Sequence, residues 1–341
     1  MSRPLRWALV LGAAGLALFV LKDKIPDGDE LSRSMTGLRP GWLGVAVVAE
    51  AMSMATFARL TRRLLTLGGA HLTVHRAVAL TYARNAVSNS LPAGPVLSIA
   101  YATRQFARLG AAKPLTAATL VLSGVYSTAT FCVLCLIALL GQPSTRVPTV
   151  LALAALAVTA SAAVVLRPRG LRDWLRRRSP GTFDQLRAAR GAIRLAGRDR
   201  LALIGLALAN WLLDVACLAA VCAAAGVTIG PHTVLLAYVA AKAAAVPALI
   251  PGGLGVTELG LAGTLIAAGV TGGAAAAVVL LYRLISYWAV LAAGWLAWLL
   301  LLDGFRARLA VAGHRLWIAF IRGNVVMDPC AAAYSSCDLW R

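Results

Sequence analysis

The sequence is poor in acidic residues and histidine, and its cysteines follow no spacing that indicates a metal site or a disulfide framework. Asp and Glu together number 13 in 341 residues, and there are four histidines and six cysteines. Cys132 and Cys135 lie within an apolar run, where cysteine usually packs as a small hydrophobic residue. No Walker motif for nucleotide phosphates occurs. The sequence therefore argues against metal, redox and ATP-driven chemistry, and we expect no cofactor and no metal ligand.

Long hydrophobic runs, by contrast, dominate the chain. Hydrophobic residues make up 60% of it, whereas a soluble domain contains roughly 45–50%. Most runs approach or exceed the ~20 residues that a helix needs to cross a bilayer. They are Trp7–Leu21, Gly41–Ala58, Leu115–Leu140, Val147–Leu166, Leu201–Ala225 and Ala274–Leu302. The sequence predicts an all-α polytopic membrane protein with about six full transmembrane helices. The first run follows Arg3 and Arg6 but lacks the cleavage site of a signal peptide.

Basic residues lie mainly in the loops, which indicates membrane topology rather than nucleic-acid binding. The formal net charge is +20, and residues 167–200 alone carry eleven arginines. Because Lys and Arg mark the cytoplasmic side, both termini are predicted to be cytoplasmic, in the inner membrane of a bacterial cell. Apolar residues among these arginines fit a helix lying on the cytoplasmic leaflet, where anionic lipid headgroups attract basic side chains. Ordinary topology without specific binding explains this basic loop equally well.

Two further apolar stretches, Ala77–Arg108 and Thr233–Ala268, are interrupted by proline and glycine. The interruptions are at Leu91–Pro95 and Ile250–Gly255. The loop charges require each stretch to begin and end on one side of the membrane, cytoplasmic for the first and outer for the second. We therefore expect two re-entrant helical hairpins that enter from opposite faces. The alternative is that the longer arm, Thr233–Ile250, crosses the membrane fully.

The two hairpins align without gaps when Pro92 is placed on Pro251. The matching positions are Gly94 with Gly253, Ser98 with Thr257, Gly110 with Gly269, and Ser127 with Ser286. Each hairpin is followed by one long hydrophobic run. Inverted repeats whose broken helices meet near the bilayer midplane are typical of secondary transporters. The sequence therefore predicts an inverted repeat.

Charged residues also fall inside the hydrophobic segments. They are Glu50, Arg84, Asp214, Lys242, Glu258 and Arg283. Such charges are unfavourable by ~3 kcal/mol or more and are functional candidates by default. Equal numbers of acids and bases suggest internal pairing. The alternative is structural, with Glu258 and Arg283 as a buried ion pair and Arg84 reaching the membrane surface along its aliphatic stem. The nearby aromatics Tyr282 and Tyr287 are expected to act in packing or as interface anchors.

The two breaks offer backbone groups that suit an anion. A helix that begins near Gly94 or Gly253 presents free N–H groups and the positive end of its dipole, an arrangement that binds phosphate. The candidate headgroup-binding residues are Glu258, Arg283, Arg84, Lys242, Asn89, Gly94, Gly252, Gly253, Asp214 and Glu50. We expect the basic members to hold an anionic lipid headgroup and Glu258 to meet any cationic part of it. No residue is assigned a catalytic role.

A motif at the second break resembles the signature of the lysylphosphatidylglycerol synthase transmembrane-region family, also called flippase-like. It reads Pro251-Gly-Gly-Leu-Gly-Val-Thr-Glu258, followed by Leu281-Tyr-Arg283. The first break, Asn89-Ser-Leu-Pro-Ala-Gly-Pro95, is similar to the family's first conserved stretch but has Pro-Ala-Gly-Pro in place of Pro-Gly-Gly. Glu258 and Arg283 match the acidic and basic positions of the family.

This resemblance implies a function in lipid movement. In the bifunctional members this region translocates aminoacylated phosphatidylglycerol between leaflets, while a separate soluble domain transfers the aminoacyl group. Stand-alone members act in glycolipid or polyprenyl-lipid pathways. We assign residues 1–305 to one flippase-like domain and expect residues 306–341 to be a cytoplasmic tail without ordered structure. No such transferase domain is recognisable after Leu302, so this chain alone is not expected to make lysylphosphatidylglycerol.

Three functions remain open at this stage. The first is a translocase that moves a polar-headed, aminoacylated or glycosylated lipid between leaflets. The second is an intramembrane lipid-modifying transferase with Glu258 as general base, although the sequence contains no clear catalytic motif and we favour a non-enzyme. The third is an accessory subunit of a lipid or cell-envelope synthase. Membrane lipids are the expected partners, and a partner synthase and self-association are both compatible with the sequence.

Overall fold

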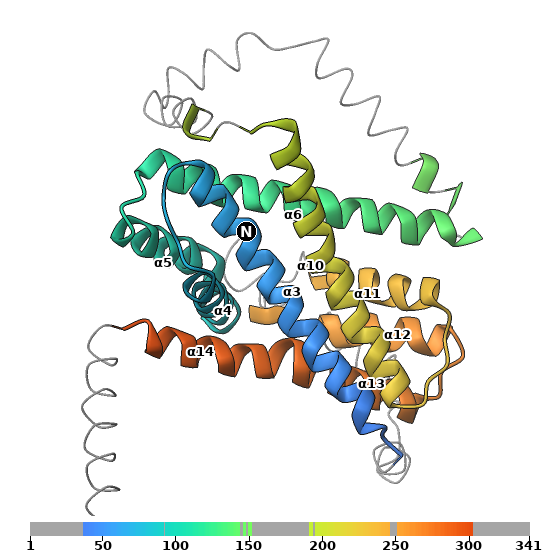
Figure 1. The fold of residues 1–341 in the computed structure, drawn as a ribbon. Coiled ribbons are helices and arrows are strands. Elements are labelled where there is room, and N and C mark those ends of the chain that lie inside the picture. The colour runs from blue at the N-terminus through green and yellow to red at the C-terminus, as the bar shows by residue number, and fades with distance from the viewer. Residues whose placement is uncertain are drawn as a thin grey trace, which may run out of the picture.

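The computed structural model describes seven segments of the chain, and all the regular structure in them is helical. The segments are residues 37–91, 93–143, 146–147, 149–151, 191–193, 195–245 and 251–302. Several predictions fall outside these segments: the first hydrophobic run, most of Val147–Leu166, most of the basic loop at 167–200, and the tail at 306–341. The described helices form one bundle, shown in Figure 1.

Four helical spans are long and apolar enough to cross a membrane, and each coincides with a predicted run. They are α3 (Pro40–Leu67), α6 (Lys113–Gly141), α10 (Gly197–Ala224) and the continuous stretch Gly272–Leu300. This last stretch consists of α13 (Gly272–Arg283), a π-helical segment η3 (Leu284–Ala289) and α14 (Val290–Leu300). The chain is thus a polytopic membrane protein, and four of the predicted transmembrane helices are confirmed.

The outward faces of these spans are apolar, as contact with lipid requires. On α6, Val121, Val125, Val133 and Ile137 are each more than half exposed. A soluble monomer rarely exposes a continuous apolar face of this kind. Buried hydrophobic residues form two clusters, one around Tyr238 and Tyr282, the other including side chains of α3, α5 and α6.

Four shorter helices form two pairs, each interrupted at a predicted break. Helices α4 (Val74–Ser90) and α5 (Gly94–Arg108) make the first pair; α11 (Pro231–Ala245) and α12 (Val256–Ala267) make the second, with the short 3-10 helix η2 (Pro251–Gly253) between them. The two members of each pair pack against each other. At 1.5 Å per residue none of the four reaches across ~30 Å of hydrocarbon.

The two halves of the described bundle follow one plan: a long helix, a broken pair, and a second long span. Each end of α10 lies 157 positions after the corresponding end of α3. Further along, the ends of α5 and α12 and the beginnings of α6 and α13 differ by 159 positions, the spacing of Pro92 and Pro251. The chain reversals between them match as well. Ala111 N bonds to Phe106 O in the first half, and Val270 N bonds to Leu265 O in the second. The correspondence in spacing between the two halves therefore extends to α3 and α10, which the alignment on Pro92 and Pro251 does not include.

The equivalent helices α3 and α10 run in opposite directions and pack along their length (Figure 1). Near the start of α3, Arg39 N donates to Ala224 O at the end of α10, over 3.0 Å. Near the end of α3, Arg63 pairs with Asp199 at the start of α10, over 2.9 Å. Small buried residues line both helices, which lets their backbones approach closely.

Candidate functional site

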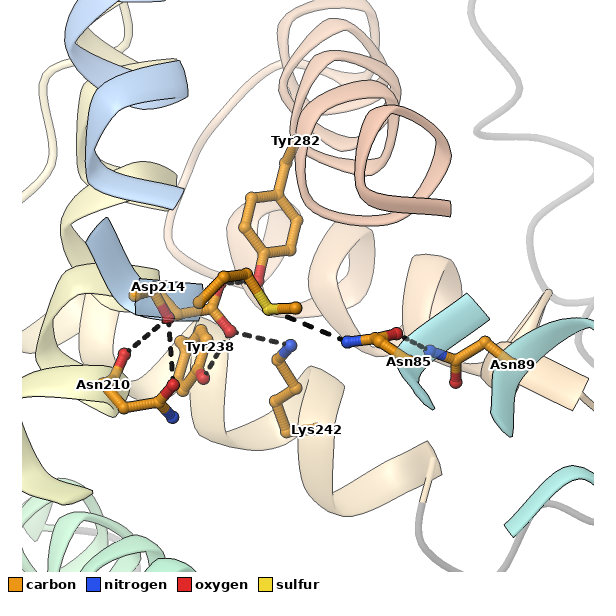
Figure 2. A network of polar contacts seen from close by, with 9 residues as sticks. Asn85, Asn89, Asn210, Asp214, Tyr238, Lys242 and Tyr282 are labelled. Atoms are coloured by element: carbon orange, nitrogen blue, oxygen red, sulfur yellow. Dashed lines mark hydrogen bonds and ion pairs between the residues drawn. The ribbon is translucent and has the colours of Figure 1, made fainter. Parts of the chain in front are cut away.

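Asp214, in the middle of α10, is the centre of a buried polar network that we call the Asp214 cluster. Its members are Glu50, Asp214, Tyr238, Lys242 and Tyr282. Asp214 Oδ1 accepts a hydrogen bond from the Tyr282 hydroxyl at 2.7 Å, and Oδ2 accepts one from Tyr238 at 2.9 Å. Lys242 Nζ lies 2.9 Å from the same Oδ2. Figure 2 shows three of these side chains converging on Asp214 from α11 and α13. The carboxylate is therefore held by one cation and two neutral donors.

Glu50 approaches the same carboxylate from α3. It is only 7% exposed, and its carboxyl group lies close enough to that of Asp214 for their charges to interact. Its second oxygen, Oε2, is buried and has no hydrogen-bond partner among the described residues. Two of the predicted acidic candidates thus lie side by side, and only one of them pairs with a cation.

Helical spacing explains how this network is assembled. Tyr238 and Lys242 are four residues apart on α11 and therefore share a face. Asn210 and Asp214 have the same spacing on α10. Ser53, on α3, donates to the backbone oxygen of Asn210 at 2.9 Å. This hydrogen bond joins α3 to α10 one helical turn before Asp214 (Figure 2).

A second network, the Arg283 cluster, lies at the second break. Its members are Asn89, Gly252, Glu258, Arg283 and Tyr287. Arg283 Nε lies 2.6 Å from Glu258 Oε1, and Nη2 donates to the Gly252 carbonyl oxygen at 3.2 Å. The guanidinium carbon lies 4.3 Å from the centroid of the Tyr287 ring, a cation–π distance. The cation is therefore bound to a carboxylate, to the backbone of the break and to an aromatic face.

Tyr287 connects the two breaks. Its hydroxyl donates to the backbone oxygen of Asn89, at the end of α4, over 3.3 Å. Its ring fills the space beside Gly252, where an added Cβ would lie 2.3 Å from a ring carbon. Gly252 has a left-handed backbone (φ +67°), which glycine adopts without strain. Tyr287 belongs to η3, and single π-helical turns of this kind are frequent at functional sites.

The first break shares one backbone feature with the second. Ala93 lies 159 positions before Gly252 and also has a positive φ, +57°. Both breaks therefore have a left-handed residue at this position, although the first has alanine where the second has glycine, and the second continues with positive φ at Gly253 and Gly255. Asn89 is additionally linked to Asn85 by a side-chain hydrogen bond on one face of α4 (Figure 2).

The expected free N–H groups at the first break are not there. The N–H groups of Gly94 and Val96 bond to Leu91 O and Ala93 O, because the chain closes a tight turn before α5. At the second break α12 begins at Val256 rather than near Gly253, and the backbone group that contacts Arg283 is a carbonyl. Gly94 and Gly253 instead permit close packing: an added Cβ would lie 2.1 Å from Ser88 O and 2.8 Å from the Ala245 Cβ, respectively.

Arg84 joins neither cluster. Its Nε is buried and has no hydrogen-bond partner among the described residues. Glu258 likewise keeps one buried oxygen, Oε2, without a partner in the described part of the chain. The buried atoms without a hydrogen-bond partner in the described part of the chain thus include donors on cations and acceptors on acids, as the binding of a ligand with both charges would require.

The hydrogen bonds that three tyrosines donate within the two clusters were not predicted from the sequence. Tyr282 and Tyr287 were expected to pack or to anchor an interface, but their hydroxyls donate hydrogen bonds within the two clusters. Tyr238, for which the sequence predicted no role, also donates to Asp214. Two signals were present: Tyr238 precedes Lys242 by one helical turn, and Tyr282 stands beside Arg283 in the family motif.

The comparisons with known proteins agree with this architecture. No individually curated protein matches the chain. One family model does match. It covers most of the chain, including the two breaks and both clusters. The resemblance noted at the second break is therefore confirmed: the chain belongs to the family described as the lysylphosphatidylglycerol synthase TM region, whose model matches residues 6–294.

Proposed function

We propose that this protein is a lipid translocase that moves a polar-headed lipid, aminoacylated or glycosylated, between the leaflets of a bacterial inner membrane. The observation that carries the proposal is the junction of the two breaks through Tyr287, with the Arg283–Glu258 pair beside it. Broken helices that meet between two repeats form the substrate sites of many secondary transporters.

The proposed topology is an inverted repeat with two re-entrant hairpins. Antiparallel packing of α3 and α10, the equivalent helices of the two halves, supports it. In this arrangement α4–α5 enters from the cytoplasm and α11–α12 from outside, with both termini cytoplasmic. The basic loop at 167–200 would then face the anionic lipids of the cytoplasmic leaflet.

The headgroup would bind by exchanging partners with the Arg283 cluster. A lipid phosphate would compete with Glu258 for Arg283, and the released carboxylate would be free to bind an ammonium group. The unused Nε of Arg84 provides a further donor for the phosphate. Acyl chains would remain in the bilayer while the headgroup passes between the breaks.

Cells that carry Glu258→Gln or Arg283→Ala test this proposal against its two rivals. We expect lipid synthesis to continue while outer-leaflet exposure of the lipid, measured with a membrane-impermeant amine label, falls at least severalfold. Arg63→Ala, which removes only the partly exposed pair with Asp199, is the matched control and should retain exposure. Loss of the lipid product itself would indicate an intramembrane transferase. Normal synthesis and exposure in both variants would indicate an accessory subunit of a synthase.

A further inference from the structure

The charges inside the described bundle do not pair completely. Arg283 pairs with Glu258, and Lys242 pairs with Asp214. Of the six charged candidates, this leaves one acid, Glu50, and one base, Arg84. No ion pair joins these two in the described part of the chain. The neighbour of Glu50 is instead Asp214, a second acid.

Glu50 and Asp214 are two buried acids in one cluster, each 7% exposed. Ionised carboxylates have only acceptor oxygens, so neither can donate to the other unless one of them is protonated. Two buried carboxylates that share a site cannot both stay ionised, and the single ammonium of Lys242 lies on Asp214. Glu50 also has a buried oxygen without any donor among the described residues, an unfavourable state for a carboxylate. Glu50 is therefore the group that carries the proton.

We infer that Glu50 and Asp214 form a proton-binding site inside the membrane, and that this proton is exchanged in each cycle of lipid movement. The second half of the inference rests on the proposed function, whereas the first half does not. The proton comes from water on one side, forms an O–H bond at Glu50, and returns to water on the other side when that bond breaks. No other reactant is needed.

Glu50 is the member of the Asp214 cluster that can change charge, because the other groups around it stabilise Asp214 as the carboxylate. The titratable groups that face it are Asp214 and Cys217 on α10, Tyr238 and Lys242 on α11, Tyr282 on α13, and Tyr82 on α4. Lys242 and the two tyrosines on α11 and α13 are bound to Asp214 and fix it as the carboxylate. Among these groups Glu50 alone is an acid without a cation.

Two consecutive residues connect the proton-binding site with the proposed lipid site. Tyr282, which donates to Asp214, and Arg283, which pairs with Glu258, are consecutive residues of α13. A headgroup that displaces Arg283 from Glu258 therefore also moves the tyrosine that stabilises Asp214. With Glu50 protonated, Arg84 is the one interior cation not balanced by an acid among the described residues, and a lipid phosphate restores neutrality. Proton release and phosphate release are thereby linked through charge.

Purified full-length protein in phosphatidylcholine vesicles provides the direct test, with fluorescently labelled lysylphosphatidylglycerol as the probe and dithionite to quench the outer leaflet. If one proton moves with each lipid, a pH difference of one unit should drive the leaflet ratio of the probe toward about tenfold. Glu50→Gln keeps the shape of the protonated side chain, and its amide can still donate to Asp214. At any rate of exchange that the dithionite assay detects, this variant should leave the leaflet ratio near one with and without the pH difference.

A wild-type protein that exchanges the probe without responding to the pH difference would overturn the proton coupling and leave the translocase intact. A response that persists in Glu50→Gln would exclude Glu50 as the coupling group. Absence of exchange in the wild type would instead contradict the proposed function for this lipid.

Infrared spectroscopy decides the proton site independently of transport. The wild type at neutral pH should show the carbonyl stretch of a buried protonated carboxyl group, and Glu50→Gln should lose it. Glu258→Gln is the matched control, because Glu258 pairs with Arg283 and should contribute no such band. A band that survives in Glu50→Gln would rule out protonated Glu50.

Discussion

Tyr282 and Arg283 are neighbours in sequence, yet each is bound to a different buried acid. The Tyr282 hydroxyl donates to Asp214 on α10, and Arg283 pairs with Glu258 on α12. Consecutive residues on a helix point about 100° apart, so α13 can serve two clusters at one level of the bundle. The end of α13 is therefore the place where a change in one network reaches the other.

Replacing Asp214 with Asn should destabilise the protein strongly. The substitution removes the acid that pairs with Lys242 and accepts from two tyrosine hydroxyls. Breaking one partner of a buried pair is unfavourable by up to about 3–5 kcal/mol, and ionisation of the neighbouring Glu50 would offset part of that loss. Denaturant unfolding in detergent micelles measures this effect. Asp199→Asn breaks the more exposed pair with Arg63 and should change the unfolding free energy by only about 0–1 kcal/mol. Equal effects of the two substitutions would show that the Asp214 cluster does not stabilise the fold.

Replacing Gly252 with Ala should abolish transport, whereas Gly255→Ala should be tolerated better. Both glycines have positive φ, so both variants strain the backbone, and Gly255, with ψ −50°, lies further from the left-handed helical region than Gly252, with ψ 7°. A larger loss at Gly252 can therefore be assigned to a side-chain collision. Only at Gly252 does the new Cβ collide with the Tyr287 ring, while nothing lies within 4 Å of the corresponding point at Gly255. The comparison is made in the vesicle exchange assay. Matching losses in the two variants would mean that backbone conformation matters there and the contact with Tyr287 does not.

Replacing Tyr287 with Phe isolates the hydrogen bond between the two breaks. The ring remains over Arg283, and only the donation to Asn89 is lost. Stability should fall by about 1 kcal/mol, the usual contribution of a neutral hydrogen bond. Lipid exchange should slow several-fold, since the two breaks would no longer be held together. Exchange at the wild-type rate in a variant with the expected loss of stability would make this bond purely structural.

The orientation of the repeat can be tested at one pair of equivalent positions. Ala112 and Thr271 precede α6 and α13 as their N-caps, and both are exposed. In an inverted repeat they face opposite sides of the membrane. Single-cysteine variants of a cysteine-free protein should therefore differ: a membrane-impermeant maleimide should label T271C in intact spheroplasts but A112C only after permeabilisation. Labelling of both from one side would contradict the inverted topology.

The local features of this protein are determined by the sequence itself. Hydrophobic runs predicted four of the described spans, because the bilayer demands uninterrupted apolar helices of fixed length. Proline and glycine marked both breaks, since proline within an apolar run lacks the N–H for a helical hydrogen bond and glycine readily adopts turn conformations. The charged candidates and the family motif could also be recognised without coordinates, because each depends on residue type and short-range spacing.

Only the tertiary structure decided which groups meet. Asp214 and Tyr282 are 68 residues apart, and Asn89 and Tyr287 are 198 apart. No helical period connects such positions, so neither the partners of the tyrosine hydroxyls nor the proximity of Glu50 to Asp214 could be predicted. The match of α3 with α10 was hidden for a related reason: a membrane-spanning helix needs only sufficient length and apolar character, which many sequences satisfy. The correspondence of α3 with α10 follows from the equal spacing of their first and last residues and from their antiparallel packing. Both are properties of the folded chain.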